Sequence, residues 1–389
     1  MRVLLVHNAY QQRGGEDSVV ESEAALLRQR GHDVRVLLRH NDEVNGLSRW
    51  NLAAQTLWSH KTVTQLSSMT AQDRPDVIHV HNTLPLVSPS VFWFATRHRV
   101  PVVQTLHNFR LLCPQATLLR DGRVCEDCVG RLPWAAVKHR CYRDSAAQTA
   151  AVAVMLGVHR ALGTWRHKVT RFIALTQFGK DKFVQGGLDA QRIDIKPNFM
   201  DMMPPPDWSA RQGGLYVGRL SVEKGVEVLM EVMRAYPEHR LTVIGSGPFE
   251  APMREVAGPA YLGAQPLSEV MRQLSSASYL VLPSVCYEGF PRTLVEAFAC
   301  GVPVIASRHG ALAELVDDGR TGLLFKPGDA ADLMAKLQWA DANPQAMQAM
   351  GHAARLEYES CYTPERNGQQ LEEIYRRAMA DVAHPRTSD

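Results

Sequence analysis

The sequence predicts an α/β protein made of two successive doubly wound domains, and three observations support this fold class. Short, continuous apolar runs alternate with helical stretches in both halves of the 389 residues, a pattern typical of parallel sheets covered on both faces. A break at 198–214, rich in proline and glycine, separates the two halves. The length suggests two or three domains at roughly 100–200 residues each. Because ligands of such folds bind beyond the carboxyl ends of the strands, we expect two Rossmann-like domains facing a cleft.

The expected elements follow this alternation. We expect an N-terminal domain over 1–200 with a Cys-rich insertion at 107–145, a linker at 201–212, a C-terminal domain over 213–368, and a helix at 369–389 that returns to the N-terminal domain. The expected strands of the first domain are 3–6, 34–38, 77–80, 102–106, 173–175 and 193–195, with a helix at 19–30. Those of the second are 215–217, 241–244, 279–282 and 302–305, with helices at 225–235, 267–276, 293–299 and from 330 onward.

Composition excludes several classes of protein. Hydrophobic residues make up 45% of the chain and charged residues 21%, which is close to globular averages and unlike a disordered or fibrous chain. No apolar run approaches the ~20 residues that span a bilayer, and the nearest, at 145–158, is soon followed by Arg160. The first residues lack the long apolar stretch and cleavage site of a signal peptide. We therefore expect a cytoplasmic protein whose seven cysteines are thiols or metal ligands.

Charge is distributed unevenly along the chain. Residues 1–200 contain 26 Lys and Arg against 16 Asp and Glu, whereas residues 201–389 contain 17 against 24. A basic half favours anionic partners such as nucleic acid, an acidic lipid surface or a phosphorylated acceptor. A solvated basic face without a partner is the alternative, and charge alone does not separate these interpretations.

The most informative motif follows the expected strand at 279–282. Glu288-Gly289-Phe290-Pro291 forms a loop, and Thr293-Leu294-Val295-Glu296-Ala297 begins a helix. The helix N-terminus offers backbone N–H groups and a positive dipole end to a phosphate. Two carboxylates that accept hydrogen bonds from hydroxyls, beside a phosphate site, suit a nucleotide-sugar. A solvated loop and a helix surface would explain the same spacing without a ligand.

A pair of cations follows the expected strand at 215–217. Arg219 and Lys224 stand five residues apart, after Gly218 and before a helix. A guanidinium fork and an ammonium group both suit a pyrophosphate. Two surface cations are the alternative, although a cation at a helix start is slightly unfavourable to the helix dipole.

Weaker signals mark the ends of three other strands. Gly14-Gly15 follows the first strand, where paired glycines let backbone N–H groups approach an anion closely. The sequence there is not the G-x-G-x-x-G dinucleotide fingerprint. Gly247 lies in a second glycine loop at 245–248. His107 follows the strand at 102–106. From its position alone, contact with a ligand and hydrogen bonding to the local backbone are equally compatible with the sequence.

Together these residues resemble the retaining nucleotide-sugar glycosyltransferases of family 4, which have the two-domain fold called GT-B. The resemblance covers nearly the whole chain and is most specific over 215–330, where it includes Gly301-Val302-Pro303-Val304-Ile305 and Thr321-Gly322-Leu323-Leu324. The family commonly has Pro-Asn-Gly before the linker, whereas this chain has Pro197-Asn198-Phe199. That departure concerns only the conformation of the hinge.

The resemblance implies a role for each candidate residue. Arg219 and Lys224 would hold the donor diphosphate, and Glu288 would bind the sugar hydroxyls. Glu296 would bind the ribose, Gly15 the distal phosphate and His107 the donor sugar. Arg219, Lys224, Glu288 and His107 are thus the catalytic candidates. The donor-binding candidates are Gly14, Gly15, Gly218, Gly247, Phe290, Pro291, Thr293, Leu294 and Glu296.

The activity implied by the resemblance is transfer of a sugar, with retention of its anomeric configuration, from a UDP- or GDP-sugar. The acceptor would be a hydroxyl of a glycan or of a polyprenyl-diphosphate-linked glycan, as in bacterial surface polysaccharide synthesis. The N-terminal domain would bind the acceptor and the C-terminal domain the donor. The family needs no catalytic metal, and nucleic acid is not an expected partner. An epimerase of the same architecture and a non-catalytic binding module remain as alternatives.

Four of the cysteines are spaced like metal ligands. Cys113, Cys125, Cys128 and Cys141 follow the pattern C-x11-C-x2-C-x12-C, with Asp121-Gly122 as a turn before the central pair. This pattern matches a structural zinc site of four thiolates, which leaves no open position for catalysis. Uncoordinated thiols and an iron–sulfur centre are the alternatives. His139 is the substitute ligand if one cysteine is unused.

An apolar helix at 145–158 and the basic residues after it are compatible with contact to a membrane surface. Arg160, Arg166, Lys168 and Arg171 would face anionic lipid, at the inner face of the cell membrane, and Trp165 would be the interfacial anchor. A core helix followed by solvated cations is an equally acceptable interpretation.

Overall fold

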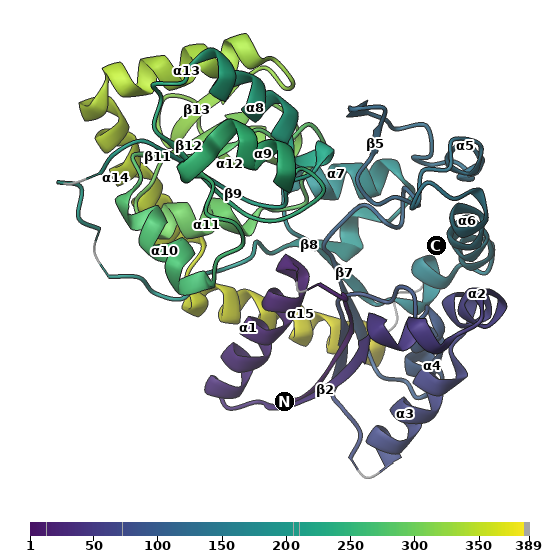
Figure 1. Cartoon of the computed structure of the whole chain (residues 1–389). Helices are drawn as coiled ribbons and strands as arrows, with labels where there is room; N and C mark the ends of the chain where they lie inside the picture. The colour runs from purple at the N-terminus through teal and green to yellow at the C-terminus, as the bar shows by residue number, and fades with distance from the viewer. Residues whose placement is uncertain (13, 72, 205, 210, 385–389) are drawn as a thin grey trace. The chain divides into compact units, whose positions relative to one another are not determined.

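The computed structural model describes residues 1–12, 14–71, 73–204, 206–209 and 211–384. The chain divides into two compact units (Figure 1). Unit 1 comprises Met1–Ala116, Glu126–Pro197 and Glu365–Asp389, and unit 2 comprises Thr117–Cys125 and Asn198–Pro364. The expected linker at 201–212 includes two residues, 205 and 210, that lie outside the described ranges. Within those ranges, no helix has the length and apolar character needed to cross a membrane.

Unit 1 is built on a six-stranded parallel sheet with the order β2-β1-β3-β4-β7-β8. The strands are β1 (Arg2–Ala9), β2 (Asp33–His40), β3 (Val77–Val80), β4 (Val102–Leu106), β7 (Arg171–Ala174) and β8 (Ile193–Ile195). β1 pairs on one side with β2 and on the other with β3, so that Val3 lies opposite both Val34 and Val77. The strand order therefore reverses between β1 and β3, where doubly wound sheets bind their ligands.

Helices surround this sheet and connect its strands. They are α1 (Gly15–Gln29), η1 (Asn41–Gly46), α2 (Arg49–Leu57), α3 (His60–Ala71), α4 (Ser90–Arg97), α5 (Trp134–Lys138), α6 (Ala146–Ala161), η2 (Thr164–Lys168), α7 (Gln177–Gln185), η3 (Ala190–Arg192) and α15 (Pro364–Ala383). α15 begins five residues before the expected helix at 369–389, and the last five residues of that prediction lie outside the described part. Pro364 is well suited to the first position of α15, because the backbone N–H groups of the first turn of a helix have no partner within the helix.

The core of unit 1 explains why the chain's last helix belongs to it. Leu371, Ile374, Tyr375 and Ala378 of α15 are buried in one cluster with Val3, Leu5, Val77, Val103 and Ile173 from the strands. Their spacing of three and four residues places them on one face of the helix. Residues separated by most of the sequence thus complete a single hydrophobic core.

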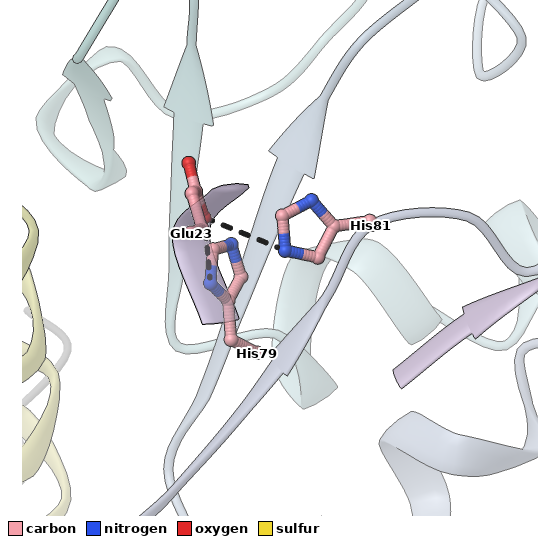
Figure 2. A group of neighbouring side chains, drawn as sticks. All are labelled: Glu23, His79 and His81. Atoms are coloured by element: carbon pink, nitrogen blue, oxygen red, sulfur yellow. Dashed lines mark ion pairs between the residues drawn. The ribbon is translucent and has the colours of Figure 1, made fainter. Parts of the chain in front are cut away.

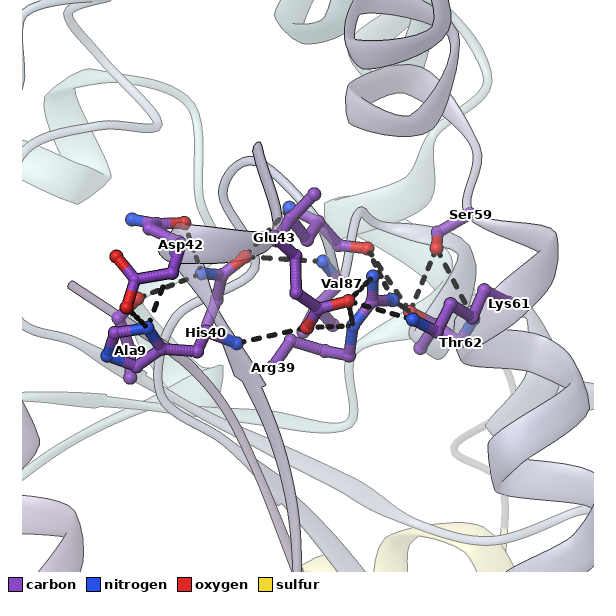
Figure 3. Close-up of polar contacts among 12 residues, drawn as sticks. Ala9, Arg39, His40, Asp42, Glu43, Ser59, Lys61, Thr62 and Val87 are labelled. Atoms are coloured by element: carbon purple, nitrogen blue, oxygen red, sulfur yellow. Dashed lines mark hydrogen bonds and ion pairs between the residues drawn. The ribbon is translucent and has the colours of Figure 1, made fainter. Parts of the chain in front are cut away.

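A polar network at the end of β2 fixes the carboxyl edge of the same sheet (Figure 3). The guanidinium of Arg39, only 2% exposed, donates through Nε and Nη2 to Glu43 at 2.9 Å and through Nη1 to Thr62 Oγ1 at 3.3 Å. Lys61 Nζ donates to the same carboxylate at 2.8 Å. Hydrogen bonds from Arg39 lower the pKa of Glu43 to about 2 despite its partial burial. The network joins η1 to α3.

Unit 2 repeats the architecture with a five-stranded parallel sheet of order β10-β9-β11-β12-β13. Its strands are β9 (Gly214–Val217), β10 (Leu241–Ile244), β11 (Tyr279–Leu282), β12 (Val304–Ser307) and β13 (Gly322–Phe325). β9 pairs with both β10 and β11, so the order reverses between β9 and β11. Its helices are η4 (Val222–Lys224), α8 (Val226–Ala235), α9 (Glu250–Ala257), η5 (Gly258–Ala260), α10 (Leu267–Ser276), α11 (Arg292–Ala299), α12 (Gly310–Leu315), α13 (Ala330–Ala342) and α14 (Pro344–Cys361).

Candidate functional site

The loops that follow β9 and β11 are packed against each other at the switch point of unit 2. Gly225 has φ +70°, and a Cβ built on it would lie 1.8 Å from the carbonyl oxygen of Pro283. Only glycine permits both this left-handed conformation and this close approach. The backbone N–H of Val285 also donates to the carbonyl of Glu223 at 3.0 Å. The two loops are thereby held together at the carboxyl edge of the sheet.

This packing brings two predicted catalytic residues into direct contact. Lys224 Nζ donates to Glu288 Oε1 at 2.7 Å, and Ser284 Oγ donates to the same oxygen at 2.5 Å. Glu288 is 12% exposed and Lys224 32% exposed in their side chains. His309 also contacts Ser284, with Nε2 2.9 Å from that residue's carbonyl oxygen.

The pair is ionised at neutral pH. Burial alone would raise the pKa of Glu288, but the Lys224 charge and the hydrogen bonds of Lys224 and Ser284 outweigh it and lower that pKa. The carboxylate likewise raises the pKa of Lys224 against the effect of burial. A charged donor and a charged acceptor therefore stand side by side at the edge of the sheet.

Arg219 precedes Lys224 in the loop that follows β9. Its side chain is exposed, and its carbonyl accepts a hydrogen bond from the Tyr216 hydroxyl at 2.8 Å. Among the described residues its guanidinium forms no ion pair with Glu288 or with another carboxylate.

Glycines shape the neighbouring loop at 245–248. A Cβ on Gly245 would lie 1.8 Å from the Gly218 carbonyl oxygen, and one on Gly247 would lie 2.4 Å from that of Leu220. The Gly218 N–H donates to Ile244 at 3.0 Å and the Gly247 N–H to the Glu250 carboxylate at 3.2 Å. Both glycines thus serve to pack this loop on the loop after β9.

α11 supplies the second predicted carboxylate. Glu296 is 6% exposed, and its nearest cation is Arg292, with Nε 3.7 Å from Oε1. Burial raises the pKa of Glu296, and Arg292 opposes this only in part. A poorly compensated buried carboxylate one turn into a helix is a ready acceptor for hydroxyl donors.

Most of the other donor-binding candidates of this motif use their side chains to pack or cap the start of α11. Pro291 is the N-cap of α11, Phe290 stacks edge-on against Tyr362 with ring centroids 5.8 Å apart, and Leu294 is fully buried. Leu294 donates its N–H to the Pro291 carbonyl at 3.1 Å. Thr293 is half-buried at the start of the helix. Side-chain contact with a ligand is thus restricted to Thr293, while Leu294 has only its backbone to offer.

At the switch point of unit 1, Gly14 is the N-cap of α1 and Gly15 its first residue. Asp17 folds back on this turn and accepts hydrogen bonds from the Gly14 N–H at 2.7 Å and the Tyr10 N–H at 3.3 Å. His7 Nε2 lies 2.8 Å from the same carboxylate. The structure therefore places the predicted phosphate-binding glycines at a helix N-terminus that is already partly capped.

His107 follows β4, two strands from β1. Its Nε2 lies 2.9 Å from Nδ1 of His81, and the two rings are stacked at 5.2 Å. The next residue, Asn108, donates to Glu16 Oε1 at 2.6 Å, which ties the end of β4 to the start of α1. Burial lowers the pKa of His107, so the ring is neutral at physiological pH.

The Cys-rich insertion contains the predicted turn. Asp121 (φ 52°) and Gly122 (φ 70°) join the antiparallel strands β5 (Leu119–Arg120) and β6 (Arg123–Val124), as a two-residue hairpin of this chirality requires. Cys113 and Cys128 are buried, whereas Cys125 and Cys141 are half-buried. His139 is exposed at the C-cap of α5.

The prediction that Trp165 is a membrane anchor is wrong. Its side chain is 5% exposed and lies against His159, with ring centroids 5.9 Å apart. Arg171, also 5% exposed, is paired with Asp194 and Asp381 at 2.7 Å each. Arg160 donates to the backbone carbonyls of Arg131 and Leu111. Trp165, Arg160 and Arg171 are therefore explained by core packing and internal hydrogen bonds rather than by contact with a membrane.

Several polar residues of the two switch points were not predicted from the sequence. Ser284 and His309 support Glu288, and Glu23, His81 and Lys196 form a buried cluster behind His107. The alternation His79-Val80-His81, at the end of a strand of otherwise apolar residues, is a sequence signal that could have pointed to the second group. Ser284 carries no such signal.

Comparison with protein families gives this geometry a context. Residues 214–357 match the family described as "Glycosyl transferases group 1" and residues 14–198 match "Glycosyl transferase 4-like domain". Both family models describe glycosyl transferases, and together they match most of the chain. Each match includes residues of one of the two units described above. The group 1 match includes the Lys224–Glu288 pair, and the 4-like match includes His107.

One curated relative of this chain is the amylovoran biosynthesis glycosyltransferase AmsK of Erwinia amylovora. It is 31% identical over 229 residues, which cover 55% of this chain and 54% of that protein. The alignments with the first three curated relatives cover 29%, 49% and 54% of their lengths. The chain thus spans about half or less of those proteins.

Solved structures of similar fold cover nearly the whole chain. Sucrose-phosphate synthase from Thermosynechococcus elongatus superposes with a TM-score of 0.72 at 20% identity, covering 97% of this chain and 99% of that one. Alr3699/HepE of Anabaena in complex with UDP-glucose gives 0.65 at 18% identity, covering 97% and 99%. At this level of identity the comparison establishes the fold, which is GT-B.

Proposed function

We propose that the protein is a retaining glycosyltransferase that moves a sugar from a nucleotide diphosphate sugar to a hydroxyl of a glycan or lipid-linked acceptor in surface polysaccharide synthesis. Lys224 and Arg219 bind the donor diphosphate, Glu288 binds the hydroxyls of the transferred sugar and Glu296 those of the ribose. Gly15 and His107 of unit 1 bind the distal phosphate and the donor sugar. Catalysis uses no metal, because the leaving diphosphate is stabilised by cations of the protein.

The ion pair between Lys224 and Glu288 is the observation that carries this proposal. A charged donor and a charged acceptor 2.7 Å apart at a switch point match a ligand that presents a phosphate next to hydroxyl groups. In the free protein the two groups neutralise each other. Arrival of the diphosphate would draw Lys224 toward the new charge, which frees Glu288 to accept hydrogen bonds from the sugar.

Two other functions fit less well. An epimerase needs acid and base groups that act on the sugar ring, but Glu288 is held ionised by Lys224 and is better suited to binding. A non-catalytic binding module would not require the Lys224–Glu288 pair at the switch point. The relative AmsK, named for amylovoran biosynthesis, supports a transferase of polysaccharide synthesis. A fold neighbour solved with UDP-glucose supports a nucleotide-sugar as the donor.

A thermal-shift screen of the purified protein against UDP-, GDP-, ADP- and TDP-sugars tests donor binding. A bound donor stabilises the folded state by RT ln(1 + [L]/Kd), about 2.7 kcal/mol at a hundredfold excess over Kd. We expect one base to stabilise the protein and the others to have little effect. Absence of a shift with every donor would contradict the proposal.

Exchange of the two glutamates for glutamine should separate their roles. Glu296→Gln should weaken binding of the bare nucleoside diphosphate by about 1.5–3 kcal/mol, the range for a hydrogen bond to a charged group, whereas Glu288→Gln should leave it unchanged and impair sugar transfer. Calorimetric titration with the nucleoside diphosphate distinguishes the variants. An equal loss of affinity in both would show that this division of roles is wrong.

The pKa of Glu296 predicts a second effect of Glu296→Gln, on the stability of the folded protein. Its folded-state pKa is raised above 4.5 by burial, so the folded state holds the proton more tightly than the unfolded state does. Ionisation therefore costs stability as pH rises above about 4.5 and through the raised value. Glu296→Gln, which cannot ionise, should raise the melting temperature of the ligand-free protein at pH 7 while it weakens nucleotide binding.

The four cysteines are proposed to hold a structural zinc ion. Metal analysis of the purified protein should find about one zinc per chain. Cys125→Ser should increase hydrogen exchange over 107–145 and lower the melting temperature, because metal binding at such a site is folding free energy. Cys361→Ser, outside the cluster, is the matched control. A metal-free preparation of full stability, with all thiols accessible to titration, would contradict the zinc site.

A contact with anionic membrane is proposed for a different surface from the one expected around Trp165. α2 and α5 each pack on α6 (Figure 1). The three helices and their flanking turns expose an apolar set, which we call the α6 surface: Trp50 (86% exposed), Leu132 (57%), Trp134 (61%), Val154 (46%), Val158 (37%) and Leu162 (52%). Arg131, Lys138 and Arg166 nearby in the sequence are also exposed. Exposed tryptophans beside cations are typical of an interfacial contact.

Vesicle flotation tests this surface. We expect the protein to float with anionic vesicles at low salt and to be released by salt, because each cation contributes about 1 kcal/mol that is screened beyond roughly 10 Å at 0.1 M. Reversal of Arg131, Lys138 and Arg166 to Glu should abolish flotation. Reversal of the exposed unit 2 residues Arg234, Arg272 and Lys326 is the control. Equal flotation with neutral vesicles, or none with either, would contradict the contact.

A further inference from the structure

Ionisable side chains form a buried chain beneath the carboxyl ends of β3 and β4 in unit 1 (Figure 2). Glu23 comes from α1, and His81 follows β3 directly. They are 1% and 4% exposed. Nε2 of His81 lies 3.6 Å from Oε2 of Glu23, and Nδ1 of His81 lies 2.9 Å from Nε2 of His107. A carboxylate thus contacts His107 through one intervening imidazole.

Lys196 sets the charge of this chain. Its Nζ donates to Oε1 of Glu23 at 2.7 Å and to the Asn367 side chain at 3.1 Å, with no exposure to solvent. Burial alone would raise the pKa of Glu23, but the charge and the hydrogen bond of Lys196 outweigh it and lower that pKa. Burial lowers the pKa of His81 well below its ordinary value. Lys196 and Glu23 are therefore an ion pair, and His81 and His107 are neutral with one ring proton each.

With one proton on each ring, the contacts fix the direction of the hydrogen bond between His81 and His107. Nε2 of His81 and Oε2 of Glu23 are both buried without a hydrogen-bond partner among the described residues, and they lie 3.6 Å apart. A proton on that nitrogen is attracted by the carboxylate, whereas a lone pair there would face the lone pairs of the oxygen in a medium of low dielectric constant. Nδ1 of His81 is then an acceptor, and Nε2 of His107 must be the donor.

We propose that Glu23 and His81 hold His107 in its Nε2–H tautomer, so that Nδ1 of His107 presents a lone pair to the ligand. This inference rests on the proposed function, in which His107 contacts the donor sugar. It deepens that function because it defines the chemical class of the contact: Nδ1 accepts a hydrogen bond from a sugar hydroxyl and repels a phosphate or carbonyl oxygen. Glu23 and His81 are positioning residues that act through His107.

A divalent cation is the competing use of the same side chains. One ligand atom each from Glu23, His79 and His81 lies within 4.8 Å of the others. However, both ring nitrogens of His79 already contact hydroxyl groups, Tyr375 at 2.8 Å and Thr105 at 2.7 Å. A cation would also stand next to the buried ammonium of Lys196, without the solvent that would screen the repulsion. These contacts favour the chain of hydrogen bonds over a metal.

Nitrogen NMR of the full-length protein labelled with 15N-histidine tests the tautomer directly. Two-bond proton–nitrogen correlations at neutral pH report which ring nitrogen carries the proton, and His107→Gln assigns the signal. We expect His107 to be protonated at Nε2 and unprotonated at Nδ1. In His81→Leu, which lacks the acceptor, His107 should become a mixture of tautomers. His81→Asn, which retains an oxygen acceptor on a short side chain, should restore the Nε2–H form.

The control is His79→Leu, because His79 is as buried as His81 and its ring nitrogens form hydrogen bonds with Tyr375 and Thr105 rather than with His107. The His107 tautomer should not change in this variant. A wild-type His107 protonated at Nδ1, or one whose signals persist in His81→Leu, would overturn the inference. Movement of the His79 and His81 signals on chelation would overturn it in favour of a cation. If His81→Leu does not fold, the double variant Lys196→Met/Glu23→Gln provides the same test, since it removes the carboxylate that orients His81 and leaves no buried charge without its partner.

Binding gives a second readout. His81→Leu should weaken the nucleotide-sugar about tenfold, as expected for one misdirected hydrogen bond, and leave the bare nucleoside diphosphate unaffected. The NMR measurement needs no ligand, so the two proposals can fail separately. A protein that has the predicted tautomer but binds no nucleotide-sugar would contradict the proposed function and leave the tautomer inference intact. A protein that binds the donor but has the opposite tautomer would contradict the tautomer inference and leave the proposed function intact.

Discussion

Lys224→Ala should lower kcat/KM for sugar transfer by about 2–4 kcal/mol, roughly 30- to 1000-fold, the scale of a lost donor that stabilises developing charge. The leaving diphosphate gains charge as the glycosidic bond breaks, so the ammonium contributes more in the transition state than in the ground state. Steady-state kinetics of nucleoside diphosphate release measures the effect. Lys326→Ala, an exposed lysine of the same unit paired with Asp329, is the control and should retain full activity.

The contact between Lys224 and Glu288 predicts a further property of these variants. Because the two side chains share a hydrogen bond, removal of either disturbs the other, and their effects should not add. The Lys224→Ala/Glu288→Gln double variant should lose less activity than the sum of the single losses. Strict additivity, or unchanged kcat/KM in Lys224→Ala, would remove Lys224 from the site.

Lys196→Met should lower the free energy of unfolding by about 3–5 kcal/mol, because it leaves the Glu23 carboxylate buried without its partner. Both side chains are almost entirely buried, and their charged atoms are 2.7 Å apart. Chemical denaturation of single and double variants measures the change. The double variant Lys196→Met/Glu23→Gln should recover part of the loss, since no charge then remains buried.

Lys61→Met is the matched control for that experiment. Lys61 also donates to a glutamate, Glu43, but its side chain is 58% exposed, and Arg39 still satisfies that carboxylate. A change within about 0.5 kcal/mol is expected at such a surface position. If Lys196→Met were equally mild, the pair would be accessible to water and the neutral state assigned to the neighbouring histidines would be wrong.

The sequence predicted most strands because buried parallel strands are continuous apolar runs. Val77–Val80, Val102–Leu106, Leu241–Ile244 and Tyr279–Leu282 have the predicted bounds. β12 begins two residues later than predicted, after Pro303, which has no N–H for the ladder. β13 at Gly322–Phe325 was missed, although its residues carried the family resemblance. Helices α2 and α3 were also missed, because each buries only one or two side chains and shows little periodicity.

The candidate site was predictable where a motif stands next to a strand end and unpredictable where it depends on tertiary contact. Glu288 and Lys224 were identified separately, but their ion pair requires the glycine-mediated packing of two loops. Burial of Trp165 could not be foreseen, since an aromatic residue among cations is equally typical of a core and of a membrane surface. Glu23 and Lys196, 173 residues apart in sequence, meet only in the folded unit.

The central claim is that the Lys224–Glu288 pair binds and activates a nucleotide-sugar donor. The most direct measurement is product analysis after incubation with the donor selected by thermal shift, with and without a membrane and glycan extract as acceptor, for the wild type and for Glu288→Gln. We expect nucleoside diphosphate release and sugar incorporation that depend on the acceptor and are lost in Glu288→Gln. An epimerised nucleotide-sugar with no diphosphate released, no turnover of a bound donor, or equal transfer by Glu288→Gln would contradict the central claim.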